Sequence, residues 1–364
     1  MAKVKMDSAK IDELLERGVA EVYPSKDALR EALQAGKQLR VYNGIDPTGD
    51  TLHIGHLASL QKLRQFQELG HEVVMLIGDF TGMIGDPTDK LASRKQQTRD
   101  EVNANAKRYE EQASAVLKFG RGGAKIRRNS EWWDGMDVRR FFELLSLTTV
   151  QRLLERDMFQ DRMKQDKPIG AHEFLYPALQ GYDAVEMDVD VEVGGTDQMF
   201  NMLMGRDYQR KLNNKEKFVI TVPLVSDANG KKIGKTEGNM VELDAAPNDL
   251  YGQAMALPDG VIIACFEQCT SLPTSEVQAI EKALAKGGNP RDLKMQLAHT
   301  FTAMRYGDDA ADAAQEAFVK TFQKHETPEE VVSVSVAKGE WKLIDLLVEV
   351  GLETSKSAAR RVIE

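Results

Sequence analysis

The sequence predicts an α/β fold over its first two-thirds, in which helices cover the faces of a parallel sheet, followed by an all-helical region. Up to about residue 245, apolar segments of strand length alternate with amphipathic segments of helix length, and this order is typical of a parallel sheet with crossover helices. The run EVVMLIGDF is almost continuously apolar, as in a strand buried on both faces. From about 247 to 325 only helical patterns remain.

Composition and charge limit the possible classes of protein. The 364 residues are 42% hydrophobic and 29% charged, which suggests a globular chain of two or three domains. We expect no membrane partner, since no apolar run approaches the ~20 residues of a spanning helix. The net charge of −9 also argues against DNA, and confines any RNA contact to local basic patches. The two cysteines, Cys265 and Cys269, are expected as reduced thiols, so we expect a cytoplasmic location.

Each predicted element has a local signal. Helices have apolar residues at near-helical spacing; Ser25 is the expected N-cap of the second helix, and Gly36 and Gly70 the expected ends of the second and third. These helices are predicted at 10–18, 26–35, 53–69 and 99–118. Strands are apolar runs that end at turn or loop residues, and are predicted at 39–45, 72–80, 124–129, 187–198 and 217–225. The polar run at 81–97 is predicted to be a long loop of the kind that often carries function.

Changes in composition predict three domains. The first, 1–245, includes an insertion at about 110–170. The second, 246–330, is helical and is punctuated by proline and glycine. The third, 336–364, is predicted to contain two helices split by Gly351, and we expect it to be the beginning of a small domain that is cut short.

The run TLHIGHLA contains two of the six histidines, His53 and His56, at the start of a predicted helix. At this spacing both project from the first turn, where free backbone N–H groups and the helix dipole favour a phosphate. Gly55 leaves space for a close approach. Spacing alone favours a phosphate site and an incidental polar pair about equally. A metal site is disfavoured, because a third ligand is missing and i,i+4 spacing is more usual.

Three further segments are candidate binding elements. The segment 226–239, SDANGKKIGKTEGN, joins a tight-turn signal to several lysines, which could clamp a polyphosphate or form an exposed hairpin. In 172–188, the residues Tyr176, Gln180 and Asp183 share one predicted helix face among apolar neighbours, a pattern typical of either a pocket lining or a solvated face. The run GGTDQ at 194–198 places a glycine pair before polar side chains at a helix start.

Taken together, these motifs resemble the class I aminoacyl-tRNA synthetases, in which HIGH precedes a lysine loop of the KMSKS type, here KIGKT. The resemblance narrows to tyrosyl-tRNA synthetases of the bacterial type. It is carried by YNGIDPTGDTLHIGHL, TGMIGDPTDK, YPALQGYDAV, VGGTDQMFN and KIGKT, which follow the family's order across residues 42–236. It implies a Rossmann-like catalytic domain, a helical tRNA-facing domain and a small RNA-binding domain.

The resemblance also implies roles for individual residues. Tyr42 and Asp183 match the pair that hydrogen-bonds the substrate phenol. The residues that hold the α-ammonium of the substrate match Asp86, Tyr176 and Gln180. The ATP and adenylate side is matched by Gly44, Asp46, Thr48, His53, Gly55, His56, Gly195, Asp197 and Gln198, the last of which also borders the tyrosine site. The residues that meet the departing pyrophosphate match Lys90, Arg94, Lys232, Lys235 and Thr236.

The implied reaction joins L-tyrosine to ATP, releases pyrophosphate and transfers tyrosine to its tRNA. ATP is a substrate, Mg²⁺ is expected with ATP, no structural metal is expected, and a homodimer is expected from the family. Glu192 departs from the glutamine common at this position, and KIGKT lacks the serine of the fuller pattern. The alternatives are a tryptophanyl-tRNA synthetase, disfavoured by Tyr42 and Asp183, and an RNA-binding paralogue that charges no tRNA.

Overall fold

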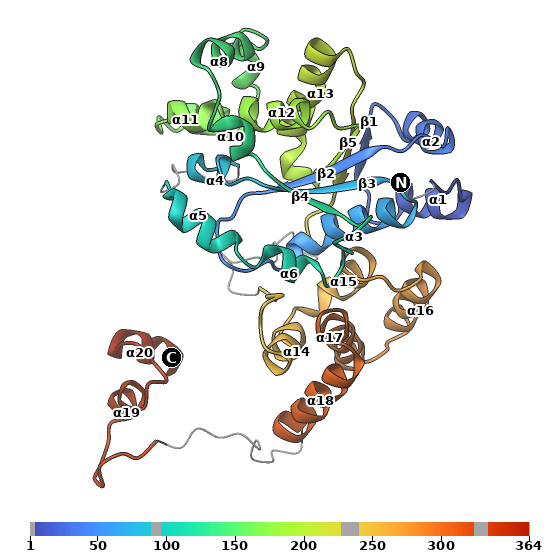
Figure 1. The fold of residues 1–364 in the computed structure, drawn as a ribbon. Coiled ribbons are helices and arrows are strands. Elements are labelled where there is room, and N and C mark those ends of the chain that lie inside the picture. The colour runs from blue at the N-terminus through green and yellow to red at the C-terminus, as the bar shows by residue number, and fades with distance from the viewer. Residues whose placement is uncertain (1–3, 89–95, 227–239, 324–333, 364) are drawn as a thin grey trace. The chain divides into compact units, whose positions relative to one another are not determined.

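A computed structural model describes residues 4–88, 96–226, 240–323 and 334–363 (Figure 1). The chain forms two compact units, Met1–Gln315 and Glu316–Glu364. In the part of the chain that the structure describes, no helix is long and apolar enough to cross a membrane.

A six-stranded sheet in the order β1-β6-β5-β2-β3-β4 forms the centre of the first unit. Its strands are β1 (Glu21–Tyr23), β2 (Arg40–Ile45), β3 (Glu72–Ile77), β4 (Lys125–Arg128), β5 (Val191–Gly195) and β6 (Phe218–Val222). All neighbouring strands pair in parallel, except that β1 pairs antiparallel with β6. The strand order runs in opposite directions on the two sides of β2, and such a switch point is where open α/β sheets bind ligands.

Helices cover both faces of this sheet (Figure 1). The helices before β5 are α1 (Ser8–Glu16), α2 (Lys26–Gln34), α3 (Ile54–Glu68), α4 (Thr81–Ile84), α5 (Arg99–Ala106), α6 (Tyr109–Ala113), α7 (Ser130–Trp133), α8 (Val138–Leu145), α9 (Val150–Leu153), α10 (Asp157–Lys164), α11 (Ala171–Phe174) and α12 (Tyr176–Glu186). After β5 come the 3₁₀ turn η1 (Thr196–Gln198) and α13 (Met199–Asn213). In Figure 1, α12 and α13 lie on one side of the sheet and α3 on the other.

The later part of the chain is helical, as predicted. It contains α14 (Pro247–Met255), η3 (Asp259–Val261), α15 (Ile262–Cys269), α16 (Thr274–Ala285), α17 (Pro290–Tyr306), α18 (Asp308–Phe318) and the π-helical turn η4 (Val319–Gln323). In the second unit, α19 (Leu343–Glu349) and α20 (Lys356–Ile363) are separated by Gly351, which confirms the predicted break.

The sequence predictions are wrong at three places in the fold. The helix predicted at 99–118 is two helices, α5 and α6, and its last residues are not helical. The loop predicted at 81–97 begins with the helical turn α4. Strand β1 was missed, so the sheet is mixed rather than wholly parallel; it has only three residues, and its partner β6 lies about two hundred residues later in the chain.

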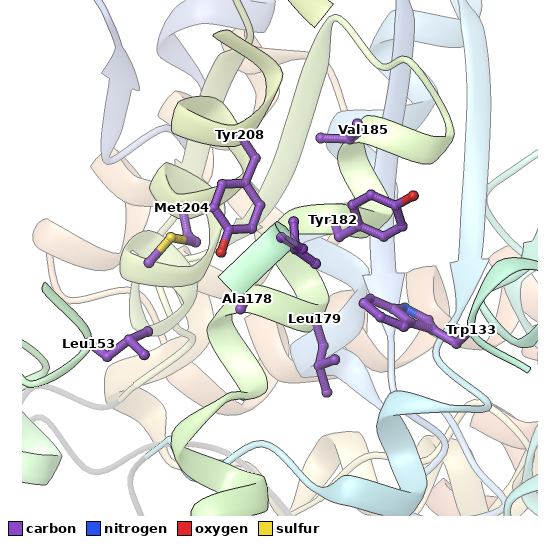
Figure 2. Close-up of a cluster of buried hydrophobic side chains, with 9 residues drawn as sticks. Trp133, Leu153, Ala178, Leu179, Tyr182, Val185, Met204 and Tyr208 are labelled. Atoms are coloured by element: carbon purple, nitrogen blue, oxygen red, sulfur yellow. The ribbon is translucent and has the colours of Figure 1, made fainter. Parts of the chain in front are cut away.

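A core of buried aromatic and aliphatic side chains fixes α12 against α13 and the short helices before it (Figure 2). Trp133 stacks on Phe80 with ring centroids 5.6 Å apart and meets Tyr182 of α12 edge-on at 5.2 Å. Leu153, Ala178 and Tyr208 belong to the same cluster. Because this core holds one face of α12, the orientation of its opposite face is fixed as well.

Candidate active site

A pocket of about 320 Å³ opens at the carboxyl ends of β2, β5 and β6. It brings together fourteen of the predicted site residues from five chain segments: Tyr42, Gly44, Asp46, Thr48, His53, Gly55, His56, Asp86, Tyr176, Gln180, Asp183, Gly195, Asp197 and Gln198. The other predicted site residues, Lys90, Arg94, Lys232, Lys235 and Thr236, lie outside the described residues. Volume and lining suit a ligand of small-molecule size.

The two histidines form the cap of helix α3 at one part of this pocket. His53 is the N-cap, and its Nδ1 accepts from the Gly55 N–H at 3.1 Å, while the His53 N–H donates to His56 Nδ1 at 3.1 Å. Burial and the neighbouring His53 lower the pKa of His56 well below its ordinary value, so this ring is neutral near pH 7. A neutral ring that accepts at Nδ1 carries its proton on Nε2, which makes it a hydrogen-bond donor there.

The structure changes the explanation for Gly55. A Cβ atom at this position would lie 2.9 Å from the His53 ring, which is closer than real Cβ contacts. The glycine is therefore needed so that His53 can fold back over the helix start. The sequence predicts that Gly55 leaves space for a ligand. The contact with His53 is a second reason for a glycine at this position.

Described residues on both sides of the 227–239 segment lie beside the histidines or the pocket. Val225, before the segment, lines the pocket. Beyond it, the Val241 carbonyl accepts from the Ile54 N–H at 3.0 Å, and the Leu243 N–H donates to the Leu52 carbonyl at 2.8 Å. The described residues before this segment therefore lie at the pocket, and those after it lie next to His53.

Asp183 lies at the base of the pocket in a cage of donors. One carboxylate oxygen accepts from the indole N–H groups of Trp132 and Trp133, each at 2.8 Å, and the other accepts from Asn129 Nδ2 at 3.1 Å. Desolvation raises the pKa of Asp183 to about 7, although these three donors oppose the shift. The Tyr42 hydroxyl is buried and makes no hydrogen bond of ordinary geometry among the described residues, although the Glu192 carboxylate interacts with it. Burial, followed by the Glu192 carboxylate, raises the pKa of Tyr42, so the hydroxyl keeps its proton.

Polar side chains in a second part of the pocket form a hydrogen-bonded chain. Gln198 Nε2 donates to Asp86 at 2.7 Å, and Asn201 Nδ2 donates to the side-chain oxygens of Gln198 and Gln180 at 3.0 and 2.9 Å. Tyr176, which lines the same pocket, donates from its hydroxyl to Asp46 at 2.8 Å. Acceptor oxygens gathered in one partly enclosed place suit a cationic group such as an ammonium.

Several residues that shape the pocket were missed by sequence reasoning. Asn129, Trp132 and Trp133 follow directly after β4 in the run NSEWW, and polar residues at the end of a predicted parallel strand are a signal that could have identified them. Asn201 ends the VGGTDQMFN run but was assigned no role. Lys217 had no comparable signal, because its importance comes only from contacts with distant parts of the chain.

Metal binding by the protein alone has no support in the described part of the chain. There, no three histidine, cysteine, aspartate or glutamate side chains are grouped so that they could hold a metal ion. The pocket instead offers donors, acceptors and backbone groups, which can position and polarise a substrate.

Comparison with known proteins identifies relatives of the whole chain. Residues 34–323 match the family model described as tRNA synthetases class I (W and Y). The tyrosine–tRNA ligase of Moorella thermoacetica is 42% identical over 366 residues, which cover 99% of this chain and 88% of that protein. The tyrosine–tRNA ligase of Thermotoga maritima is 42% identical over 96% of this chain and 87% of that protein.

Solved structures show the same fold at lower identity. A C-terminally truncated mitochondrial tyrosyl-tRNA synthetase of Aspergillus nidulans matches with a TM-score of 0.72 and 23% identity, over 87% of this chain and 95% of that one. The Archaeoglobus fulgidus tyrosyl-tRNA synthetase, solved with L-tyrosine, matches with a TM-score of 0.67 and 19% identity, over 85% of this chain and all of that one.

Proposed function

Because the chain belongs to the class I tRNA synthetases of the W and Y family, we propose that it activates L-tyrosine with ATP and transfers the tyrosyl group to the tRNA for tyrosine. The enzyme is an aminoacyl-tRNA ligase, and its relatives carry tyrosine rather than tryptophan in their names. The observation that carries the choice of tyrosine is the buried pair formed by Asp183 and the Tyr42 hydroxyl.

This pair suits a phenol. Asp183 is held by three donors and 2% exposed, so it cannot turn away from the pocket, and a phenol O–H can donate to its ionised carboxylate. The buried Tyr42 hydroxyl, which lines the same pocket, supplies a second contact. When phenylalanine occupies such a site, these polar groups remain unpaired. The resulting discrimination in kcat/KM against phenylalanine is roughly 10⁴–10⁵, a magnitude known from a tyrosyl-tRNA synthetase.

The same logic assigns the other residues. Asp86, Tyr176 and Gln180 are proposed to hold the α-ammonium, since each offers an acceptor oxygen at the wall of the pocket. His53 and His56, with Asp46, Thr48 and the Gly44 and Gly55 backbone, are proposed on the ATP side. Gly195, Asp197 and Gln198 are proposed beside the ribose and adenylate.

Activation itself needs no covalent intermediate on the protein. The tyrosine carboxylate attacks the α-phosphate, and the bond to pyrophosphate breaks. The protein has to align these groups and stabilise negative charge on the phosphates as it develops. Imidazole Nε2 donors from His53 and His56 suit that task. Lys90, Arg94, Lys232, Lys235 and Thr236 are proposed to meet the departing pyrophosphate, and Mg²⁺ is proposed to arrive with ATP, held mainly by phosphate oxygens and water.

The proposed activity is tested by ATP–pyrophosphate exchange with each amino acid in turn. Exchange should occur with tyrosine and should be at background level with phenylalanine and tryptophan. Exchange with tryptophan alone would assign the chain to the other specificity of the family. A chain that binds RNA but supports no exchange would be a paralogue without ligase activity.

The remaining proposals concern organisation. We propose three domains with the boundaries predicted from the sequence, a cytoplasmic location in keeping with the free thiols Cys265 and Cys269, and a homodimer. The last is supported by exposed apolar side chains on the short helices α8, α9 and α10, which are Val138, Phe142, Val150 and Met163.

A further inference from the structure

Lys217 and Glu192 form a buried ion pair at the wall of the pocket, which Glu192 lines. The reaction described above does not use this pair. Their side chains are 0% and 3% exposed. Glu192 lies in β5, beside Tyr42 of β2 in the parallel register, and Lys217 directly precedes β6. Desolvation lowers the pKa of Lys217, and the Glu192 carboxylate opposes this shift. A buried pair of this kind is costly to form, so its presence calls for an explanation.

The fold reserves space for the Lys217 ammonium. Besides its bond to Glu192, Nζ donates to the Met202 carbonyl of α13 at 3.0 Å. On the same helix, a Cβ atom at Gly205 would lie 2.5 Å from this nitrogen. The ammonium is thus enclosed between β5 and α13, and Glu192 is held in place by a group that cannot move away.

The other oxygen of Glu192 determines how the Gln180 amide is turned. Glu192 Oε1 accepts from Gln180 Nε2 at 3.2 Å, and Gln180 Oε1 accepts from Asn201 Nδ2 at 2.9 Å. An ionised carboxylate can only accept hydrogen bonds. The amide nitrogen of Gln180 therefore points to the Glu192 carboxylate, and the amide oxygen is left on the side of Asn201 and the acceptor network.

We propose that Lys217 is a positioning residue, which holds the Glu192 carboxylate in place and thereby fixes the Gln180 amide with its oxygen available to the α-ammonium of tyrosine. This inference rests on the proposed function. It also explains how the chain accommodates Glu192 where glutamine is common in the family. The negative charge of Glu192 is neutralised by Lys217, which lies just before β6, the neighbouring strand.

The first test is Lys217→Met in the full-length enzyme, assayed by tyrosine-dependent pyrophosphate exchange. Without the ammonium, the Glu192 carboxylate loses the partner that holds it in place, so the Gln180 amide is no longer held with its oxygen toward the substrate ammonium. The KM for tyrosine should rise about tenfold to a hundredfold, the usual worth of a hydrogen bond to a charged group. The KM for ATP should stay within about twofold of wild type.

Lys62→Met is the matched control. Lys62 is also a buried lysine, 3% exposed, and its Nζ donates to the carbonyls of Leu14 and Arg17 at 2.7 and 2.6 Å, outside the pocket. This variant should lower the melting temperature and leave both KM values unchanged. A comparable rise in the KM for tyrosine in Lys62→Met would show that the effect of Lys217→Met is general destabilisation, which would overturn the proposal.

Two double variants separate positioning from packing. Lys217→Met/Glu192→Met removes both charges and should restore the melting temperature, but the KM for tyrosine should stay raised, because Gln180 has lost its acceptor. Lys217→Met/Glu192→Gln keeps an acceptor and should bring the KM for tyrosine back toward the wild-type value. If Lys217→Met/Glu192→Met has the same KM for tyrosine as the unmodified enzyme, the positioning proposal is overturned. If the unmodified enzyme itself shows no tyrosine-dependent exchange, the proposed function is refuted instead.

Discussion

Asp183 shows at the scale of one residue how burial sets the chemistry of the pocket. Its pKa is raised to about 7 by desolvation, and the unfolded value is near 4. The folded state therefore holds the proton more tightly, and the contribution of Asp183 to stability is lost as the pH rises from about 4 through 7. The phenol, in contrast, needs the ionised carboxylate as its acceptor, so stability and substrate binding have opposite pH dependence at this residue.

We predict that kcat/KM for tyrosine falls as the pH is lowered through about 7, because protonation of Asp183 in the free enzyme removes the acceptor of the phenol O–H. The measurement is the pH profile of tyrosine-dependent pyrophosphate exchange at constant ATP. Asp183→Asn is the control: its kcat/KM should be lower at all pH values, and this step in the profile should be absent. The same step in both enzymes would assign the titration to another group.

At the scale of helices and strands, pattern and spacing predict most of the site. Tyr176, Gln180 and Asp183 could be predicted to share a face because helical periodicity fixes it, and the pocket indeed collects all three. Polar residues that follow a strand end were predictable for the same geometric reason. The Lys217–Glu192 pair was not predictable, because it depends on which side chains of separate elements meet after folding. The two indole donors follow a strand end, but their contact with Asp183 could not be predicted, for the same reason.

Arg17, directly after α1, connects this helix to the end of α15. Its guanidinium, only 9% exposed, donates to the carbonyls of Phe266, Glu267, Thr270 and Leu272 at and after the end of α15. Helix α15 in turn packs on α3, which begins at the histidines. Arg17→Met should lower the free energy of unfolding by about 2–4 kcal/mol, since four carbonyls, three of them in partly buried contacts, lose a charged donor.

Chemical denaturation measures the effect of Arg17→Met, with the exposed Arg139→Met as control. The control should change the free energy of unfolding by less than about 0.5 kcal/mol. Equal, small effects of both substitutions would show that the α15 carbonyls are satisfied without Arg17.

At the scale of the whole molecule, charge is unevenly distributed. The net charge is −9, yet the second unit carries Lys356, Arg360 and Arg361 on helix α20. We predict that Arg360→Glu/Arg361→Glu lowers kcat/KM for tRNA charging about tenfold or more, while pyrophosphate exchange stays unchanged. Only charging requires contact with the phosphate backbone of the tRNA. Equal charging by wild type and variant over a range of salt concentrations would remove this helix from the tRNA contact.

The proposed homodimer is a second prediction at this scale. Phe142 is 66% exposed on α8, where a buried apolar partner surface would stabilise association. Phe142→Glu should convert the dimer into a monomer, measured by sedimentation equilibrium, whereas Met6→Glu, at another exposed apolar side chain, should not. A wild-type chain that sediments as a monomer would contradict the proposal.

A crystal structure of the enzyme with a stable analogue of tyrosyl-adenylate tests the assignment of the pocket most directly. We predict that the phenol oxygen lies within hydrogen-bond distance of both the Tyr42 hydroxyl and the Asp183 carboxylate, that the ammonium meets Asp86 and the Gln180 oxygen, and that the adenylate lies beside His53 and His56. An analogue bound with its phenol away from Tyr42 and Asp183, or outside this pocket, would contradict the proposed site.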